Sequence, residues 1–145
     1  MYQRICTAGA LLETDALDAP ASNGAPGIET LLSIVYARGV ATGRITVERM
    51  VDLLATSPAR RFGLARKGAL EVGRDADLVL FDPSARRTIR QADLHHTSDF
   101  TPYDGIAVEG AVRSTFVRGR AVVCDGRSVA ERGWGRFVER GGAGG

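Results

Sequence analysis

The segment Ser22-Asn23-Gly24-Ala25-Pro26-Gly27 has the residue types best suited to presenting backbone groups to a small ligand. Glycine permits backbone angles that other residues avoid, and proline holds one φ angle, so the segment predicts a turn. Because no side chain blocks its approach, such a turn before a helix can offer N–H and C=O groups to a ligand. On spacing alone, a tight turn that only starts a helix is the simpler interpretation.

Side chains that could perform catalysis or hold a metal are few. The only histidines, His95 and His96, are adjacent, and adjacent side chains of an extended chain point to opposite faces, so they make a poor ligand pair. We expect them to serve in loop hydrogen bonding or in a subunit contact. Cys6 and Cys124 lack a local basic partner, and Lys67 is interpreted as a surface charge. The sequence therefore assigns no catalytic residue and no metal ligand.

Helical periodicity covers the region after the glycine turn. Apolar residues at i, i+3, i+4 and i+7 predict a helix from Ile28 to Arg38, with Gly39 as a left-handed C-terminal cap. The same spacing predicts a second helix over 46–56, with Thr46 as its N-cap and Met50 in the core. A third, short helix is expected to have Ser57 as its cap and to end at Gly63.

The period changes from helical to strand-like near Arg66. We expect a short strand at 69–72, a turn at 73–75 and a covered strand at 78–81 that Asp82-Pro83 ends. Residues 87–90 are predicted as an edge strand. Two further strands, at 112–117 and 121–124, flank a hairpin signal at 118–120, and Asp125-Gly126 marks the next turn.

Composition excludes several classes of protein. The chain has 145 residues, a formal net charge of +2, 44% apolar and 25% charged residues, as is usual for a globular domain. This charge is too small to argue for nucleic acid or a membrane surface as a partner. No run is long enough to span a bilayer, and no signal peptide is evident, so we expect a cytoplasmic protein.

Several segments resemble one known family, the cyclic amidohydrolases of the hydantoinase and dihydropyrimidinase type, with allantoinase and dihydroorotase as close relatives. Asn23 to Thr30 is similar to the loop before their last barrel helix, and Ser57 to Leu64 to their "NPA-x-x-FGL" segment. The remaining similar segments, in the family's order, are Arg66-Lys67-Gly68 with Asp75 to Pro83, Leu94-His95-His96, Thr101 to Gly105, and Gly133 to Phe137.

The resemblance implies an α+β chain made of the last helices of a (β/α)₈ barrel and the C-terminal strands of a small β-sandwich. We expect residues 21–65 to be the helical barrel part and residues 66–140 the β-sandwich segment. Residues 141–145 are expected to form a flexible tail. Residues 1–20 match neither part and are left unassigned, which leaves open an internal or misassigned start at Met1.

The resemblance also implies chemistry. Family members open cyclic amides with two divalent metal ions, usually zinc, and their Asp-His pair is not matched by Asp15-Ala16 or Asp18-Ala19, so this chain is expected to bind no metal. At the positions of Asn23 and Gly24, main-chain atoms of the family hold the –CO–NH– edge of the ring, so both are expected to bind substrate. The expected partners are a small cyclic amide or imide and, at full length, further copies of the chain.

Two functions follow from these observations. The first is part of a hydrolase for hydantoin or dihydropyrimidine rings, or for allantoin or dihydroorotate, which is inactive as an isolated chain. The alternative is a non-catalytic interaction or assembly module, because some dihydropyrimidinase-like proteins lack the metal ligands. A third interpretation, an unrelated small α+β binding domain, does not explain the ordered segments.

Overall fold

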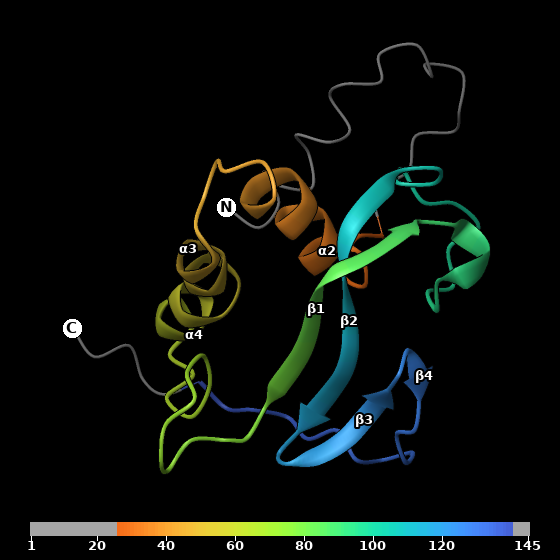
Figure 1. Cartoon of the computed structure of the whole chain (residues 1–145). Helices are drawn as coiled ribbons and strands as arrows, with labels where there is room; N and C mark the ends of the chain where they lie inside the picture. Colours follow the sequence, from red (N-terminus) through yellow and green to blue (C-terminus); the bar gives the residue numbers. More distant parts are fainter. Residues whose placement is uncertain (1–25, 141–145) are drawn as a thin grey trace.

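The computed structural model describes residues 26–140, in which two helical stretches precede an antiparallel sheet (Figure 1). The first stretch is α2 (Leu31–Val35), continued by the π-helical turn η1 (Tyr36–Val40). The second runs without a break through α3 (Val47–Val51), η2 (Asp52–Thr56) and α4 (Ser57–Arg61). The last of these helices ends at Arg61 and the first strand begins at Leu78, so the change from helices to strands falls between these two residues.

The predicted cap of the second helical stretch is confirmed. The Thr46 hydroxyl accepts a hydrogen bond from the backbone N–H of Arg49 at 3.2 Å, which satisfies one of the unpaired donors at a helix start. Met50 is buried, as expected. At the other end, Gly63 has φ +66°, and the N–H of Leu64 donates to Ala59 O at 2.8 Å, so the helix ends where the sequence indicates.

Two predictions about helix ends are wrong. Gly39 is no left-handed cap: the helix continues to Val40, and the Gly39 carbonyl accepts from the N–H groups of Arg44 and Ile45. Ser57 caps no third helix, because its own backbone is helical (φ −64°, ψ −43°). The π-helical turn η2 leads directly into α4, so Pro58 lies inside a continuous helix, and the Ser57 hydroxyl donates to Asp52 Oδ1 at 2.8 Å.

The sheet has the strand order β1-β2-β3-β4 and is antiparallel throughout. Its strands are β1 (Leu78–Thr88), β2 (Ala107–Val117), β3 (Arg120–Cys124) and β4 (Arg127–Ser128), with a 3₁₀ turn, η3 (Gln91–Asp93), between the first two. The predicted hairpin is confirmed: Arg118 and Gly119 have φ +51° and +77°, and Asp125 and Gly126 repeat the pattern. Two successive positive φ angles match the twist of neighbouring strands.

The strand predictions for residues 69–90 need correction. Residues 69–72 form no strand, and no other segment of the described residues forms a β-ladder with them. Asp82-Pro83 does not end β1, which continues across a bulge between Asp82 and Arg86 and reaches Thr88. A proline is tolerated there because a bulge interrupts the ladder, so its missing N–H costs no ladder bond. Of the predicted edge strand at 87–90, residues 87 and 88 are the end of this same strand, and residues 89 and 90 lie beyond it.

The core lies where the first helical stretch rests on the sheet (Figure 1). Ile89 and Val108 are buried there, and the rings of Tyr36 and Phe81 meet with centroids 4.9 Å apart. Gly110, with φ +91°, makes this contact sterically feasible, because a Cβ atom at its position would lie 2.4 Å from Phe81 Cζ and 2.6 Å from Tyr36 Cδ1. Any side chain at this position would displace the aromatic pair.

Two apolar faces are more exposed than the sequence indicates. Ile28, the first member of the predicted helical stripe, is 89% exposed, whereas Thr30 and Ser33 are each only 1% exposed. The buried face of this helix therefore includes the polar residues Thr30 and Ser33, and it does not include Ile28 as the periodicity predicts. Val79 and Leu80, predicted to lie in a covered strand, are also exposed on β1, which is one of the two edge strands of the described sheet.

Candidate functional site

The predicted substrate-binding residues Asn23 and Gly24 lie outside the described residues, so their role stays a prediction. The description begins at Pro26, and from there the chain turns directly into the helix. The Gly27 carbonyl accepts from the Leu31 N–H at 2.9 Å and from the Thr30 hydroxyl at 3.3 Å. The predicted entry of this segment into a helix is thus confirmed from Gly27 onward.

A polar corner, formed by Glu29, Ser33, Arg87 and His95, lies immediately after this turn. The backbone N–H of His95 donates to Glu29 Oε2 at 2.9 Å, and the Nδ1 atom of His95 lies 2.9 Å from Glu29 Oε1. One carboxylate therefore engages two groups of a residue 66 positions away in the sequence. Loop hydrogen bonding, one of the two expected roles of His95, is confirmed.

Charges around Glu29 keep it ionised. Its partial burial would raise the carboxyl pKa, but the hydrogen bonds from His95 and the charges of His95 and Arg87 outweigh this, and the net pKa lies below 4.5. Arg87 reaches the corner from β1, with its Nη2 atom 3.5 Å from the Ser33 hydroxyl. The first turn of the helix is thus contacted from both the 91–105 loop and the sheet.

The loop that carries His95 is tied down by its own polar contacts. Asp104 Oδ1 accepts from the Gln91 N–H at 2.7 Å, the Gln91 side chain donates to Ser98 O at 2.8 Å, and the Gly105 N–H donates to Ile89 O at 2.9 Å. Both ring nitrogens of His96 are buried without a partner among the described residues. His96 therefore turns inward while His95 bonds to the helix, as expected for adjacent residues of an extended chain.

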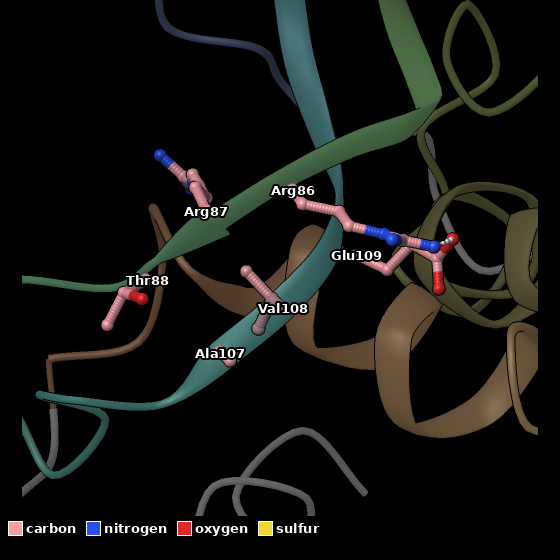
Figure 2. A pocket seen from close by; sticks show the side chains of 6 residues that line it. All are labelled: Arg86, Arg87, Thr88, Ala107, Val108 and Glu109. Carbon is pink, nitrogen blue, oxygen red and sulfur yellow. Dashed lines mark ion pairs between the residues drawn. The ribbon is translucent and has the colours of Figure 1, made fainter.

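A shallow groove of about 530 Å³ runs along the same end of the sheet. It is lined by Arg86, Arg87 and Thr88 of β1 and by Ala107, Val108 and Glu109 of β2 (Figure 2). Arg86 extends toward Glu109, at 3.6 Å, whereas Arg87 points away from that pair. Arg86 pairs with Glu109 and Arg87 contacts the Ser33 hydroxyl, so both arginines that line the groove have a partner within the protein.

Lys67 is not the free surface charge that the sequence suggests. Its ammonium group lies 2.9 Å from Asp75 Oδ2 and also contacts Asp77, and its side chain is only 18% exposed. Burial would lower the pKa of Lys67, but the hydrogen bonds and charges of the two aspartates outweigh this and raise it. Asp77 in turn accepts from the Arg118 N–H at 2.8 Å, so the cluster joins the end of the helices to the β2–β3 hairpin.

The described residues offer no metal centre: within 26–140, no three His, Cys, Asp or Glu side chains come close enough together to hold an ion. Cys124 is a free, exposed thiol at the end of β3, and Cys6 lies outside the description. Within the same range, no helix is long and apolar enough to cross a membrane.

Comparison with known proteins decides the family. A profile described as the amidohydrolase family matches residues 8–130, which is most of the chain. The chain belongs to the amidohydrolase family. It is also 42% identical, over 119 residues, to the D-phenylhydantoinase of Escherichia coli, a match that covers 81% of this amidohydrolase chain and 26% of the relative.

Solved structures agree with this assignment. A D-hydantoinase aligns with this amidohydrolase chain at a TM-score of 0.79 and 42% identity, covering 82% of this chain and 26% of that one. A dihydropyrimidinase from Brevibacillus agri aligns at a TM-score of 0.73 and 40% identity, covering 75% and 24%. The chain thus spans about a quarter of the length of these relatives.

Residues of the segments that carry the family resemblance make long-range or cross-turn contacts in this amidohydrolase chain. Glu29 of the first segment holds His95 of the "LHH" segment, and Lys67 holds Asp75 and Asp77. Near the C-terminal end, the guanidinium carbons of Arg118 and Arg120 lie 4.7 and 4.9 Å from the centroid of the Trp134 ring, and Trp134 Nε1 donates to Val117 O. Sequence reasoning missed the Glu29–His95 contact because it joins residues 66 positions apart. It missed the Lys67 contacts because they depend on how the turn between Lys67 and the two aspartates folds.

Proposed function

We propose that this chain is the C-terminal part of a cyclic amidohydrolase that opens hydantoin or dihydropyrimidine rings. The observation that carries this proposal is the 42% identity to a D-phenylhydantoinase together with the TM-score of 0.79 to a D-hydantoinase. The chain contributes a substrate-positioning loop and a β domain. Allantoin and dihydroorotate are the other ring substrates consistent with the family resemblance.

The substrate-positioning role belongs to the main chain of Asn23 and Gly24. A planar –CO–NH– edge needs one donor and one acceptor side by side, and the backbone of a glycine turn can offer both without a side chain in the way. The described turn that follows, from Gly27 to Leu31, is consistent with this role because it fixes where the helix begins. Changes to the Asn23 side chain are then less important than changes to the backbone of Gly24.

The two-metal centre implied by the family does not fit residues 26–140, where no three potential ligands gather. We therefore assign that centre to polypeptide outside these residues and derive no step through it. In this proposal, this part of the chain binds and orients the substrate ring. It supports the turn that contacts the ring, and the sheet packs against the helix that follows that turn.

The proposed architecture explains the exposed apolar side chains. Leu70 is 77% exposed, and Val72, Val79 and Leu80 are exposed beside it in the chain or on β1. In a longer amidohydrolase, we assign this surface to the interior of the β-sandwich and the helices before residue 62 to the last part of the (β/α)₈ barrel. An open edge strand with apolar neighbours is otherwise a hazard for aggregation.

A chimera tests the proposal. The matching 119-residue segment of the Escherichia coli D-phenylhydantoinase is replaced by that of this chain, and hydrolysis of phenylhydantoin is measured. We expect an active enzyme, whereas the purified 145-residue chain alone should be inactive. Turnover by the isolated chain, or a folded chimera without activity, would contradict the proposal.

Two variants of the chimera test the main-chain role. Asn23→Ala keeps both backbone groups and should change kcat/KM by less than about threefold. Gly24→Pro removes the N–H group and should reduce kcat/KM by about a hundredfold or more, since a lost oriented donor costs about 1–3 kcal/mol and the turn is also distorted. Equal effects of the two substitutions would contradict a main-chain role.

The second candidate function, a non-catalytic assembly module, is favoured by the exposed Phe137 and Val72 side chains, which such a module would bury between copies. Size-exclusion chromatography with light scattering separates the two functions. A monodisperse oligomer that binds no hydrophobic dye supports the module, whereas a monomer or aggregate that binds the dye supports the enzyme part.

A further inference from the structure

A second pocket, of about 460 Å³, lies where the segment after the helices, the β2–β3 hairpin and the C-terminal segment meet. Its lining is dominated by long cationic side chains, unlike that of the groove along the sheet. These cations are Arg66, Lys67, Arg118, Arg136 and Arg140. All of the residues that line the pocket belong to the part of the chain that the structure describes.

Protein contacts hold two walls of this pocket in place. On the side of the helices, the Lys67 ammonium lies 2.9 Å from Asp75 Oδ2, and the Asp75 N–H donates to Arg66 O at 3.0 Å. On the side of the hairpin, Asp77 Oδ1 accepts from the Arg118 N–H at 2.8 Å. A pocket whose walls are already fixed loses little conformational freedom when a ligand binds.

Arg118 reaches from the hairpin to the C-terminal segment. Its guanidinium carbon lies 4.7 Å from the centroid of the Trp134 ring, and its Nη2 atom donates to Trp134 O. Trp134 is held in turn by the hydrogen bond from its Nε1 to Val117 O at 3.2 Å. Because Arg118 both lines the pocket and lies over this indole ring, a ligand that pairs with Arg118 changes the surroundings of Trp134.

Two of the cations are already matched by carboxylates. Arg66 pairs with Asp75 at 2.8 Å, and Lys67 pairs with both Asp75 and Asp77. Two positive and two negative side chains therefore compensate one another on the side of the helices. This half of the pocket offers a ligand little net charge.

The other half has an excess of positive charge. Within residues 26–140, Arg118, Arg136 and Arg140 form no ion pair, and neither does Glu139, the remaining carboxylate of the lining. The guanidinium carbon of Arg140 lies 5.3 Å from the centroid of the Phe62 ring, which neutralises no charge. Three guanidinium groups and one carboxylate leave an excess of two positive charges, which attracts a ligand of the opposite charge.

We propose that this pocket binds a small organic dianion, a phosphate monoester or a dicarboxylate, that pairs with Arg118, Arg136 and Arg140. A guanidinium group binds a phosphate or a carboxylate through two parallel hydrogen bonds. Phe137 and Val138 also line the pocket and are 91% and 39% exposed, so they offer an apolar surface to the carbon part of the ligand. This binding does not depend on the proposed ring-opening activity.

The first experiment titrates the 145-residue chain with phenyl phosphate and with phenylmalonate by isothermal titration calorimetry. We expect saturable binding of at least one of them, and the more tightly bound anion identifies the charged group that the pocket prefers. Raising the salt from about 0.01 M to about 0.1 M should weaken binding about fivefold or more, because exposed charges are screened. Phenol, which lacks the charge, should not bind. No saturable binding of either anion, or equally tight binding of phenol, would overturn the proposal.

The second experiment repeats the titration with variants of the lining. Arg136→Gln and Arg140→Gln should each weaken binding by about fivefold, because each removes one of the three guanidinium groups. Arg132→Gln is the matched control, since Arg132 is an exposed arginine of the same segment that does not line the pocket. The proposal fails if Arg136→Gln binds the anion as tightly as Arg132→Gln does.

A variant that gains affinity excludes misfolding as the explanation. Glu139→Gln removes the unpaired carboxylate of the lining and should tighten binding by about threefold. Asp99→Asn is its control, because Asp99 is an exposed carboxylate of the 91–105 loop and does not line the pocket. Equal affinities of these two variants for the anion would count against the site.

The fluorescence of Trp134, the only tryptophan in the sequence, tests where the anion binds. Its emission should change with the same Kd as calorimetry gives, because pairing with an anion alters the charge that Arg118 holds over the indole ring. Sodium chloride at equal ionic strength should give no saturable change. Binding that is measured by calorimetry but leaves the emission of Trp134 unchanged would overturn the proposal, because Arg118 would then not belong to the site.

Discussion

The two ends of β1 differ in how they meet the rest of the molecule. After its bulge, β1 carries Arg87 into the polar corner, where contacts join segments that are tens of residues apart. Before the bulge, Val79 and Leu80 of β1 are exposed, and so are Leu70 and Val72, which precede the strand in the chain; these four residues are called the apolar edge below. The four residues of the polar corner have partners at one end, and apolar side chains are left exposed at the other. A run of apolar residues in the sequence thus marks side chains suited to burial, but it does not ensure that another part of the described chain covers them.

The largest loss of stability is expected for Gly110→Ala. Gly110 lies opposite the bulge that separates the two regions of β1. A methyl group there would lie 2.4 Å from Phe81 Cζ, on a backbone with φ +91°. We expect a loss of about 3 kcal/mol or more in the free energy of unfolding, measured with urea, from overpacking and backbone strain together. Gly126→Ala is the control, because it has φ +74° but open space around it, and should cost about 1 kcal/mol.

A smaller effect is expected at the ion cluster that joins the helices to the sheet. Lys67→Ala removes a mostly buried ammonium from two aspartates and should cost about 1–2 kcal/mol of stability. Arg66, which also pairs with Asp75, is 69% exposed, and Arg66→Ala should cost less than about 0.5 kcal/mol. Similar losses of stability for Lys67→Ala and Arg66→Ala would mean that the lower exposure of Lys67 does not make its ion pairs more stabilising.

Acid should weaken the bulge of β1, where Asp82 lies. Hydrogen bonds from the Ser84 hydroxyl, the Arg113 guanidinium and the Ser84 N–H lower the pKa of Asp82 from 3.8 to about 2. A depressed pKa stabilises the fold above pH 3.8, and this contribution is lost as the pH falls from 3.8 to about 2. Thermal melts across this range should show a shallower pH dependence for Asp82→Asn; an unchanged slope would contradict the assignment.

The smallest effect on stability is expected at the apolar edge itself. Replacing Leu70 and Val72 by serine removes exposed apolar groups and should change the free energy of unfolding by less than about 0.5 kcal/mol. The same double variant should bind visibly less of a hydrophobic dye such as ANS, by fluorescence titration. A large loss of stability with unchanged dye binding would show that the edge is packed in solution.

The sequence by itself determined the features that depend on a few neighbouring residues. The N-cap at Thr46, the helix end at Gly63 and the two-residue turns at 118–119 and 125–126 all follow from backbone preferences within one turn of chain. Family membership was also readable, because the ordered segments survive as patterns of residues.

Only the tertiary structure decided which of these segments meet. The partner of Glu29 lies 66 residues away, and Lys67 pairs with aspartates beyond a turn. Strand β1 passes Pro83 because a bulge interrupts the ladder there, and Gly110 opposite the bulge makes room for the rings of Phe81 and Tyr36. Each of these depends on where a distant strand or loop comes to rest. Local preferences act within a turn of the chain, whereas pairing, burial and charge compensation are set by packing between elements that the sequence separates.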